Sequence, residues 1–163
     1  MQNNYQTIIN SISNTFPNHR FVFFTHGYAY PPVNGRGVHP GGEPPFGAIL
    51  HKLMPGPWLE PTFRDYGFFN GNSTDRSDCE QIMDAIIDRF NDMLGTLKET
   101  TNGSIKYFDL RLVADKTKRD SEWCNELHFS HGNFIKSAML MYKEIIRIDP
   151  SLSIDSPFRN QLT

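Results

Sequence analysis

The hydrophobic and polar positions of the first 25 residues predict a helix followed by a strand. Apolar side chains recur at helical spacing within residues 3–16, where one face carries Tyr5, Ile8, Ile9, Ile12 and Phe16. Residues 21–25 (Phe-Val-Phe-Phe-Thr) then form an apolar run of strand length. A run without alternation is typical of a strand that is buried on both faces, as in a parallel sheet.

Two longer helices and a second strand are predicted further along the chain. Ser77 and Glu80 match a capping box, which predicts a helix that begins at Ser77 and ends at residues 102–103, Asn-Gly. We expect its buried stripe to be Ile82, Ile86, Phe90, Met93 and Leu97. A strand follows at residues 105–113, and the last helix spans residues 132–148. The inward face of that helix is expected to carry Phe134, Ile135, Ala138, Met139, Tyr142, Ile145 and Ile146.

The stretch from residue 29 to residue 74 shows no clear period and holds most of the chain's 11 prolines. Turn-forming Pro and Gly pairs recur throughout it. We interpret residues 29–74 as a long loop that covers the domain, with a short helix at residues 46–53 and apolar contacts from residues such as Trp58. Pro150 ends the last helix, and residues 149–163 are predicted to be an extended or frayed tail.

The order of elements is helix, strand, long loop, helix, strand, loop, helix. This alternation predicts an α/β fold with a parallel sheet, in a single domain over residues 1–163. Two parallel strands make a poor free-standing core, however. Either further strands lie in the long loop, or they belong to another polypeptide segment. We therefore expect a homo-oligomer or a complementing N-terminal segment.

Composition excludes several classes of function. The net charge is −2 and no basic stripe interleaves with aromatic residues, so nucleic-acid binding is not expected. No apolar run is long enough to predict a membrane span. Residues 1–10 contain no signal peptide, which favours a cytoplasmic location but leaves the compartment of a longer parent protein open. The two cysteines, Cys79 and Cys124, are expected to be free thiols.

His128 is the strongest candidate for a catalytic residue. It lies on a loop that follows a strand and precedes a helix, which predicts a position at the carboxyl edge of the sheet. A nearby carboxylate would fix the tautomer of the ring and stabilise the imidazolium form. The alternative is a structural histidine beside a helix N-terminus.

Two other chemistries have less support. A cysteine hydrolase would use Cys124, four residues before His128, but nothing in the sequence activates its thiol. Cys79 lies in the first turn of a predicted helix, as a packing residue. Five histidines were considered for a metal site, but no three share ligand spacing: His26, His39, His51, His128 and His131. No metal or cofactor is expected.

Three runs resemble one branch of the SGNH (GDSL-like) hydrolase family. Residues 122–128 (Glu-Trp-Cys-Asn-Glu-Leu-His) resemble its last conserved block. Residues 21–30, which include His26-Gly27-Tyr28, resemble its fourth strand, and residues 107–111 resemble its fifth strand. The resemblance covers residues 3–146. It implies a three-layer α/β/α, flavodoxin-like SGNH fold of which this chain is the C-terminal part.

The resemblance implies part of a serine esterase that acts on carboxylic esters of small molecules, lipids or acetylated sugars. His128 carries over as the general base, but the Gly-Asp-Ser and Gly-x-Asn-Asp blocks of the family have no counterpart here. Asn125 occupies the usual acid position, so Glu122 is the preferred partner of His128. Glu126 is adjacent to the histidine, but strand alternation would turn its side chain away.

Three further side chains are expected to line a substrate cleft: His26, Tyr28 and Trp58. For His26 the alternative is a core histidine with satisfied hydrogen bonds, and for Trp58 it is an apolar contact that holds the long loop down. Because the nucleophile is missing, we expect the chain to be inactive alone. The alternative function is a non-catalytic binding or assembly module derived from such a hydrolase.

Overall fold

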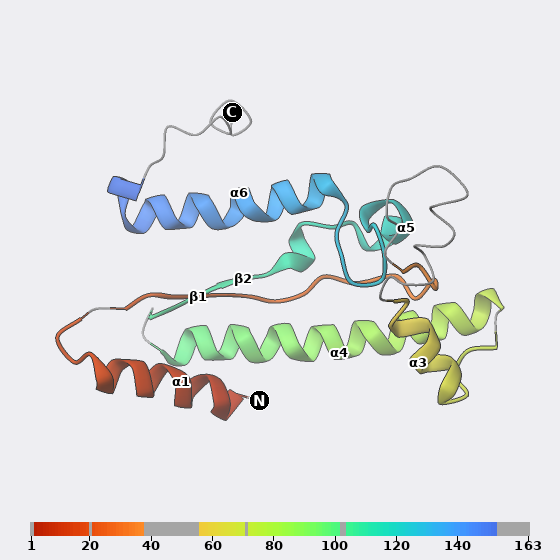
Figure 1. Ribbon diagram of the computed structural model, residues 1–163, viewed down its shortest axis with the longest axis horizontal. Helices are drawn as coiled ribbons and strands as arrows, with labels where there is room; N and C mark the ends of the chain where they lie inside the picture. Colours follow the sequence, from red (N-terminus) through yellow and green to blue (C-terminus); the bar gives the residue numbers. More distant parts are fainter. Residues whose placement is uncertain (1, 20, 38–55, 71, 102–103, 153–163) are drawn as a thin grey trace.

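The computed structural model describes residues 2–19, 21–37, 56–70, 72–101 and 104–152 (Figure 1). The described helices and strands, in chain order, are α1 (Gln2–Thr15), β1 (Phe23–His26), α3 (Leu59–Asp65), α4 (Ser73–Thr100), β2 (Ile105–Phe108), α5 (Arg119–Glu122) and α6 (His131–Ile148). Short 3₁₀ turns occupy Leu110–Leu112, Lys116–Lys118 and Pro150–Leu152. The predicted alternation of helix and strand is confirmed.

β1 and β2 form a parallel two-stranded sheet at the centre of the molecule (Figure 1). Phe23 lies opposite Ile105, and the amide of Gly27 donates to the carbonyl of Phe108 at 2.9 Å. The predicted α/β class with a parallel sheet is therefore confirmed. β2 is shorter than the predicted strand 105–113, because the Asp109 side chain accepts the Arg111 amide and begins a 3₁₀ turn.

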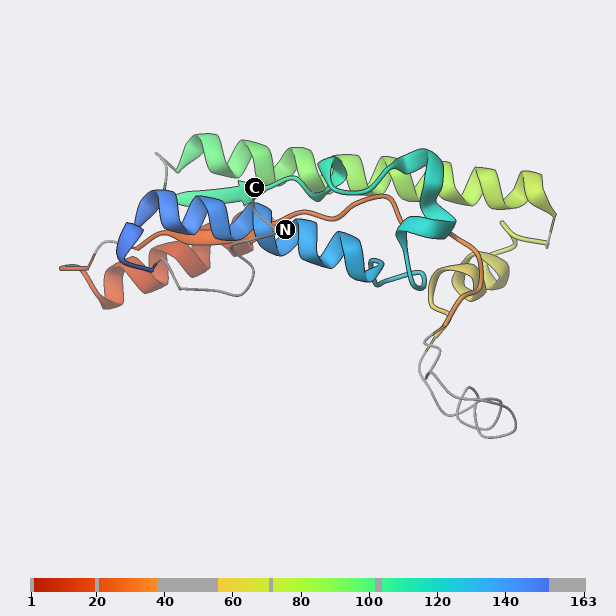
Figure 2. The ribbon, with the colours of Figure 1, turned by 90° about the horizontal axis from the view of Figure 1, so that it is seen from above.

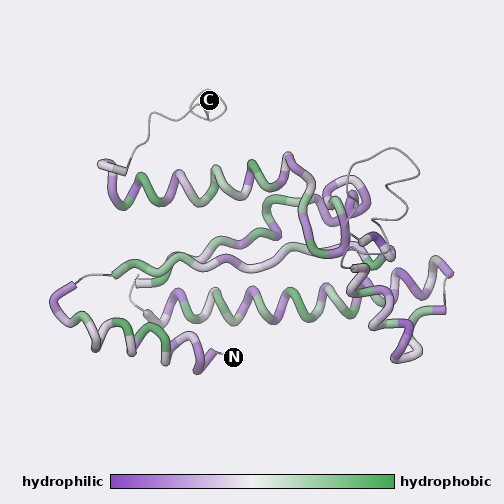
Figure 3. The backbone as a smooth tube through the Cα atoms, viewed as in Figure 1, coloured by the Kyte–Doolittle hydropathy of each residue, from purple (hydrophilic) through white to green (hydrophobic). Residues whose placement is uncertain are grey.

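Helices lie on both sides of the sheet: α1 and α4 on one side and α6 on the other (Figures 1 and 2). At the amino ends of the strands, Ile9, Leu97 and Ile105 form an apolar cluster. Beyond the carboxyl ends a second cluster joins the 123–130 loop to the chain after β2; its buried residues are Ala29, Leu110, Ala114, Trp123 and Phe129. Figure 3 shows hydrophobic and hydrophilic positions alternating along the helices on both sides of the sheet.

β1 is not buried on both faces, contrary to the prediction. Its burial alternates, and Phe24 remains 43% exposed whereas its stacking neighbour Phe108 on β2 is 6% exposed. Lys106 lies on the α6 side of β2, within 3.9 Å of Glu144. In the described part of the chain, α6 thus covers the sheet over β2 and leaves the β1 half open.

The predicted start of α4 is wrong, and of its predicted buried stripe Leu97 is buried, whereas Phe90 and Met93 are half-buried. The helix begins at Ser73, because the Asn72 side chain accepts the Asp75 amide at 2.8 Å; Ser77 therefore lies inside the helix. Ile82 and Ile86, which the periodicity turned inward, are 38% and 53% exposed. The buried side chains are Cys79, Asp84, Ile87, Asn91, Leu94 and Leu97. Asp84 and Asn91 can face inward because distant segments supply their hydrogen-bond partners.

The apolar faces predicted for α1 and α6 are corrected in the same way. In α6, Asn133 and Ser137 are buried, whereas Phe134 is 51% exposed. In α1, Ile9 is buried but Ile8 remains 57% exposed. Each helix buries fewer apolar side chains than its periodicity predicts, because few described elements pack against it.

The long 29–74 stretch contains more regular structure than the loop interpretation allowed. Pro31, Pro32 and Val33 are buried, and α3 was not predicted. The short helix expected at residues 46–53 lies outside the described residues, as does most of the 149–163 tail. No helix in the described ranges is both long and apolar enough to cross a membrane.

Candidate functional site around His128

His128 lies on the loop between α5 and α6, beyond the carboxyl ends of both strands (Figure 1). An antiparallel bridge joins Trp123 to Phe129 and closes the loop at its base. Near the loop's tip, the amide of Cys124 donates to the His128 carbonyl at 2.9 Å. These backbone bonds form a compact turn that holds an exposed imidazole at the predicted edge of the sheet.

Asn125 fixes the orientation of the His128 ring. Its Oδ1 accepts the backbone amides of Leu127 and His128, both at 2.9 Å, and lies 3.0 Å from Nδ1 of the ring. Backbone amides donate only to an acceptor, so the Asn125 atom that they meet is the side-chain oxygen. An amide oxygen cannot donate, so in its contact with Nδ1 the histidine nitrogen is the donor and carries the ring proton. Nε2 is then the unprotonated nitrogen, and it has no hydrogen-bond partner among the described residues.

Glu122, the predicted acid partner, is not brought to His128. Its carboxylate accepts a hydrogen bond from Nδ2 of Asn133, which is 1% exposed, and its backbone carbonyl accepts from the same nitrogen at 3.0 Å. No hydrogen bond or ion pair joins Glu122 to His128 in the described residues. Glu122 therefore links α5 to α6, because its carboxylate is hydrogen-bonded to Asn133 at the start of α6.

Glu126 holds the His128 loop against two distant segments. Its side chain is fully buried and turned away from His128, as the alternation predicted. Its carboxylate accepts five backbone N–H groups at 2.6–3.2 Å, from Asn34, Gly35, Trp58, Leu59 and Glu60. Five donors replace the water that the charged group loses on burial, which makes this burial tolerable. Sequence reasoning missed this role, because all five donors are backbone groups.

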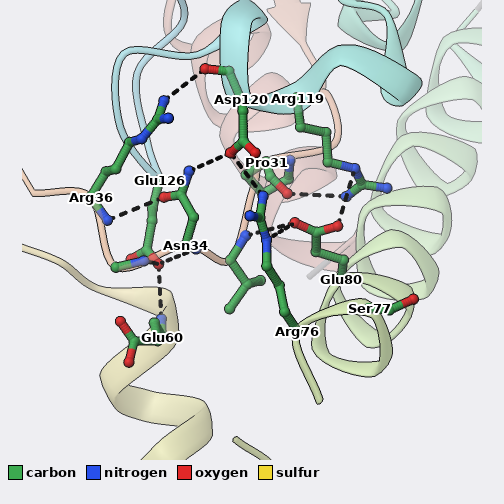
Figure 4. Close-up of polar contacts among 12 residues, drawn as sticks. Pro31, Asn34, Arg36, Glu60, Arg76, Ser77, Glu80, Arg119, Asp120 and Glu126 are labelled. Atoms are coloured by element: carbon green, nitrogen blue, oxygen red, sulfur yellow. Dashed lines mark hydrogen bonds and ion pairs between the residues drawn. The ribbon is translucent and has the colours of Figure 1, made fainter. Parts of the chain in front are cut away.

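A partly buried ionic network continues from Glu126 toward α4 (Figure 4). Arg76 donates to Glu80 at 3.0 Å and to Asp120 at 2.8 Å, and the second contact holds the pKa of Asp120 below its usual range. Arg119, 8% exposed, donates to Asp84 at 2.8 Å and to the Pro31 carbonyl at 3.1 Å. Residues 31–36, α4 and α5 are thereby held together by charged side chains.

Trp58 and Tyr28 both contact the His128 loop, in different ways. The Trp58 ring meets the His128 ring at an edge, with their centroids 6.2 Å apart. The Tyr28 hydroxyl donates to the Leu127 carbonyl, and burial raises the pKa of Tyr28 to about 12. With its hydroxyl occupied by the backbone, Tyr28 supports the loop.

His26 is the last residue of β1, and Gly27 follows it. The His26 ring is exposed and its Nδ1 lies 2.8 Å from the Gly27 carbonyl, so the core-histidine alternative is wrong. No described contact links His26 to His128. A Cβ on Gly27 would lie 1.7 Å from Oδ1 of Asn91, and only glycine allows α4 to approach this closely.

Neither cysteine is set up as a nucleophile. Both thiols are free, as predicted; Cys79 is buried and Cys124 is exposed. The Cys79 thiol contacts the Phe68 carbonyl at 3.4 Å, and burial raises its pKa, which is opposite to activation. The described residues also contain no group of three or more acidic, cysteine or histidine side chains placed to hold a metal ion; His39 and His51 lie outside them.

The site can therefore accept a proton at Nε2 of His128, beside an indole wall, but the described residues place no hydroxyl or thiol in hydrogen bond with that nitrogen. Its nearest polar support is the amide of Asn125, which orients the ring without balancing a positive charge. Comparisons of the chain with family models, curated proteins and solved structures found no match.

Proposed function

We propose that this chain is the C-terminal, histidine-bearing part of a serine esterase of the SGNH type, with His128 as general base toward carboxylic esters. One observation carries the proposal: Asn125 Oδ1 accepts a hydrogen bond from Nδ1–H of His128 at 3.0 Å, so Nε2 is left as an acceptor on an exposed ring. A general base of this kind must present an unprotonated nitrogen to the attacking hydroxyl.

The serine would come from a polypeptide segment that this chain does not contain. The sheet of the described residues supports this part of the proposal: it has two strands and a half-exposed Phe24, and within those residues it lacks the neighbours that normally complete a parallel layer. In the completed enzyme, His128 would take the proton of the serine and later activate water to release the acyl group. Trp58 would contact the ester beside the ring.

Asn125 gives the proposal a sharp first test, which needs no partner segment. In ¹⁵N NMR spectra of the neutral imidazole, His128 should carry its proton on Nδ1, whereas exposed His131 on α6 serves as the internal reference. Asn125→Ala should shift the His128 proton toward Nε2. Asn125→Asp keeps an acceptor at the same place and adds a charge, so it should move the ring's titration to higher pH. An Nε2 proton in the unmodified chain would contradict the proposed base.

Hydrolysis of p-nitrophenyl acetate tests the catalytic part. The chain alone should give no turnover above buffer, whereas co-expression with the segment encoded upstream should restore it. His128→Ala should then lower kcat by about 100-fold or more. Turnover at enzyme-like rates by the chain alone, lost in His128→Ala, would contradict the need for a second segment.

A non-catalytic module is the second candidate, and one observation favours it. The side chain at the acid position is an amide, which cannot stabilise the imidazolium form as a carboxylate does. The reading frame upstream distinguishes the two candidates. Gly-Asp-Ser and Gly-x-Asn-Asp blocks there would support the esterase, and their absence would support a module that binds or assembles.

A further inference from the structure

A groove of about 430 Å³ runs along the outer edge of β2, on the side away from β1. The last turn of α4 borders it on one side and the second half of α6 on the other. Four cations line it, Lys98, Lys106, Lys143 and Arg147, with one carboxylate, Glu144. Its floor includes Phe108, which is 6% exposed, and Leu140, which is 37% exposed.

β2 offers to this groove the backbone groups of Tyr107, which pair with no strand among the described residues. The carbonyls of Ser104 and Phe108 accept amides of the β1 chain, at 2.8 and 2.9 Å. Alternate residues of a strand present their backbone groups to the same side, so Ile105 and Tyr107 present theirs to the opposite edge. Of these two residues Tyr107 lines the groove, whereas Ile105 is 2% exposed and belongs to the apolar cluster. Within the described residues β2 pairs with β1 alone, and that edge remains open to another strand.

The charge of the groove is positive in a chain that is acidic overall. Glu144 is shared between Arg147, at 2.6 Å, and Lys106, at 3.9 Å; the Arg147 hydrogen bond lowers the pKa of Glu144. Lys98 and Lys143 are exposed and form no ion pair with the described residues. The groove therefore has more cationic than anionic side chains, although the whole chain carries a net charge of −2. A complementary ligand must therefore be anionic.

We propose that this groove binds an acidic, extended segment of a partner protein, which adds to β2 as a third strand. Backbone hydrogen bonds to Tyr107 give such a segment affinity, and its carboxylates select it through Lys98 and Lys143. Lysines beside an open edge disfavour apolar strands, because pairing would bury their charge without a partner. Carboxylates on the incoming strand remove that penalty, so the same side chains that repel a neutral strand admit an acidic one.

The test uses the full chain and a synthetic peptide that alternates Glu with Val. We expect calorimetric binding and shifts of the backbone amide signals of residues 105–108. The double variant Lys98→Glu/Lys143→Glu should weaken binding at least 10-fold, because both residues are exposed and their reversal should leave the fold intact. Arg89→Glu is the matched control, on an exposed position of α4 outside the groove, and it should bind the peptide as the unchanged chain does.

A second peptide separates strand addition from simple attraction between charges. N-methylation of alternate amides keeps the carboxylates but removes the donors that a strand needs, and it should also weaken binding at least 10-fold. Equal binding of the methylated peptide would overturn the proposal, as would equal binding by the double variant. Tripolyphosphate gives a third outcome. If it displaces the acidic peptide, and the peptide itself causes no shift of the amide signals of residues 105–108, the groove is a site for anions only and the proposal is overturned.

Discussion

At the amino ends of the strands, Ile9, Leu97 and Ile105 meet in an apolar cluster, whereas beyond the carboxyl ends the chain buries Glu126 and Arg119. The apolar end needs no particular partner: each side chain gains by leaving water, roughly in proportion to its area. The polar end depends on specific hydrogen-bond partners. A buried carboxylate or guanidinium is tolerated only while its hydrogen bonds are complete.

This difference explains why the candidate site is formed where it is. Apolar contacts alone would allow the 123–130 loop to shift, because they have little directional preference. Five N–H groups that converge on Glu126 allow one arrangement. The buried charge thus places Trp58 beside His128, at the expense of tolerance to mutation.

The strongest way to break the polar end is Glu126→Ala. It leaves five backbone N–H groups without their acceptor, and we expect a loss of about 4 kcal/mol in the free energy of unfolding. Urea unfolding followed by circular dichroism measures it. Glu99→Ala, at an exposed position of α4, is the control and should change stability by less than about 0.5 kcal/mol. A loss below about 1 kcal/mol for Glu126→Ala would mean that water replaces the carboxylate without penalty.

The apolar end is tested by Leu97→Ala. Leu97 is 1% exposed, and its truncation should cost about 3 kcal/mol through lost transfer energy and the cavity that remains. The same urea measurement applies, with exposed Leu112→Ala as the matched control. The His128 tautomer should be unchanged in Leu97→Ala, since the cluster lies at the other end of the strands. A change in that tautomer would show that the two ends are coupled.

The smallest expected effect concerns pH. Asp120 has a pKa below its usual range, chiefly through the Arg76 hydrogen bond, so its contribution is complete above the ordinary Asp pKa and is lost as pH falls through the lowered value. Because Asp120 is half exposed, we expect less than about 1 kcal/mol. Asp120→Asn should make the urea midpoint less sensitive to pH below about 4. If the urea midpoint of Asp120→Asn depends on pH as that of the unchanged chain does, Asp120 does not contribute to the stability of the polar end.

The local pattern of the sequence predicted the order of elements and the parallel pairing, because helical and strand periods depend on neighbouring residues. It also predicted a loop histidine beyond the carboxyl ends of the strands. Asn125 and His128 are three residues apart within one turn, so their contact is of short range. The preferred acid, Glu122, makes its hydrogen bonds with Asn133 on α6, a partner that the spacing around the histidine does not reveal.

Helix faces were less predictable than helix positions. Apolar periodicity turned Ile82 and Ile86 inward, but Asp84 and Asn91 lie on the buried side of α4. A polar side chain faces a protein interior when its partners are already there, and these partners come from residues 28, 107 and 119. Apolar periodicity depends only on the hydrophobicity of nearby residues, so it cannot reveal a hydrogen-bond partner from a distant segment.

By itself the sequence determined the three longer helices α1, α4 and α6, the positions of the two strands, and that a histidine lies on the loop before the last helix. Tertiary structure alone decided which charges are buried and what holds the loop. The five donors to Glu126 lie 66–92 residues away and are backbone amides, which every residue except proline possesses. Such donors cannot be identified from the sequence, because their position depends on the path of the backbone in the folded chain.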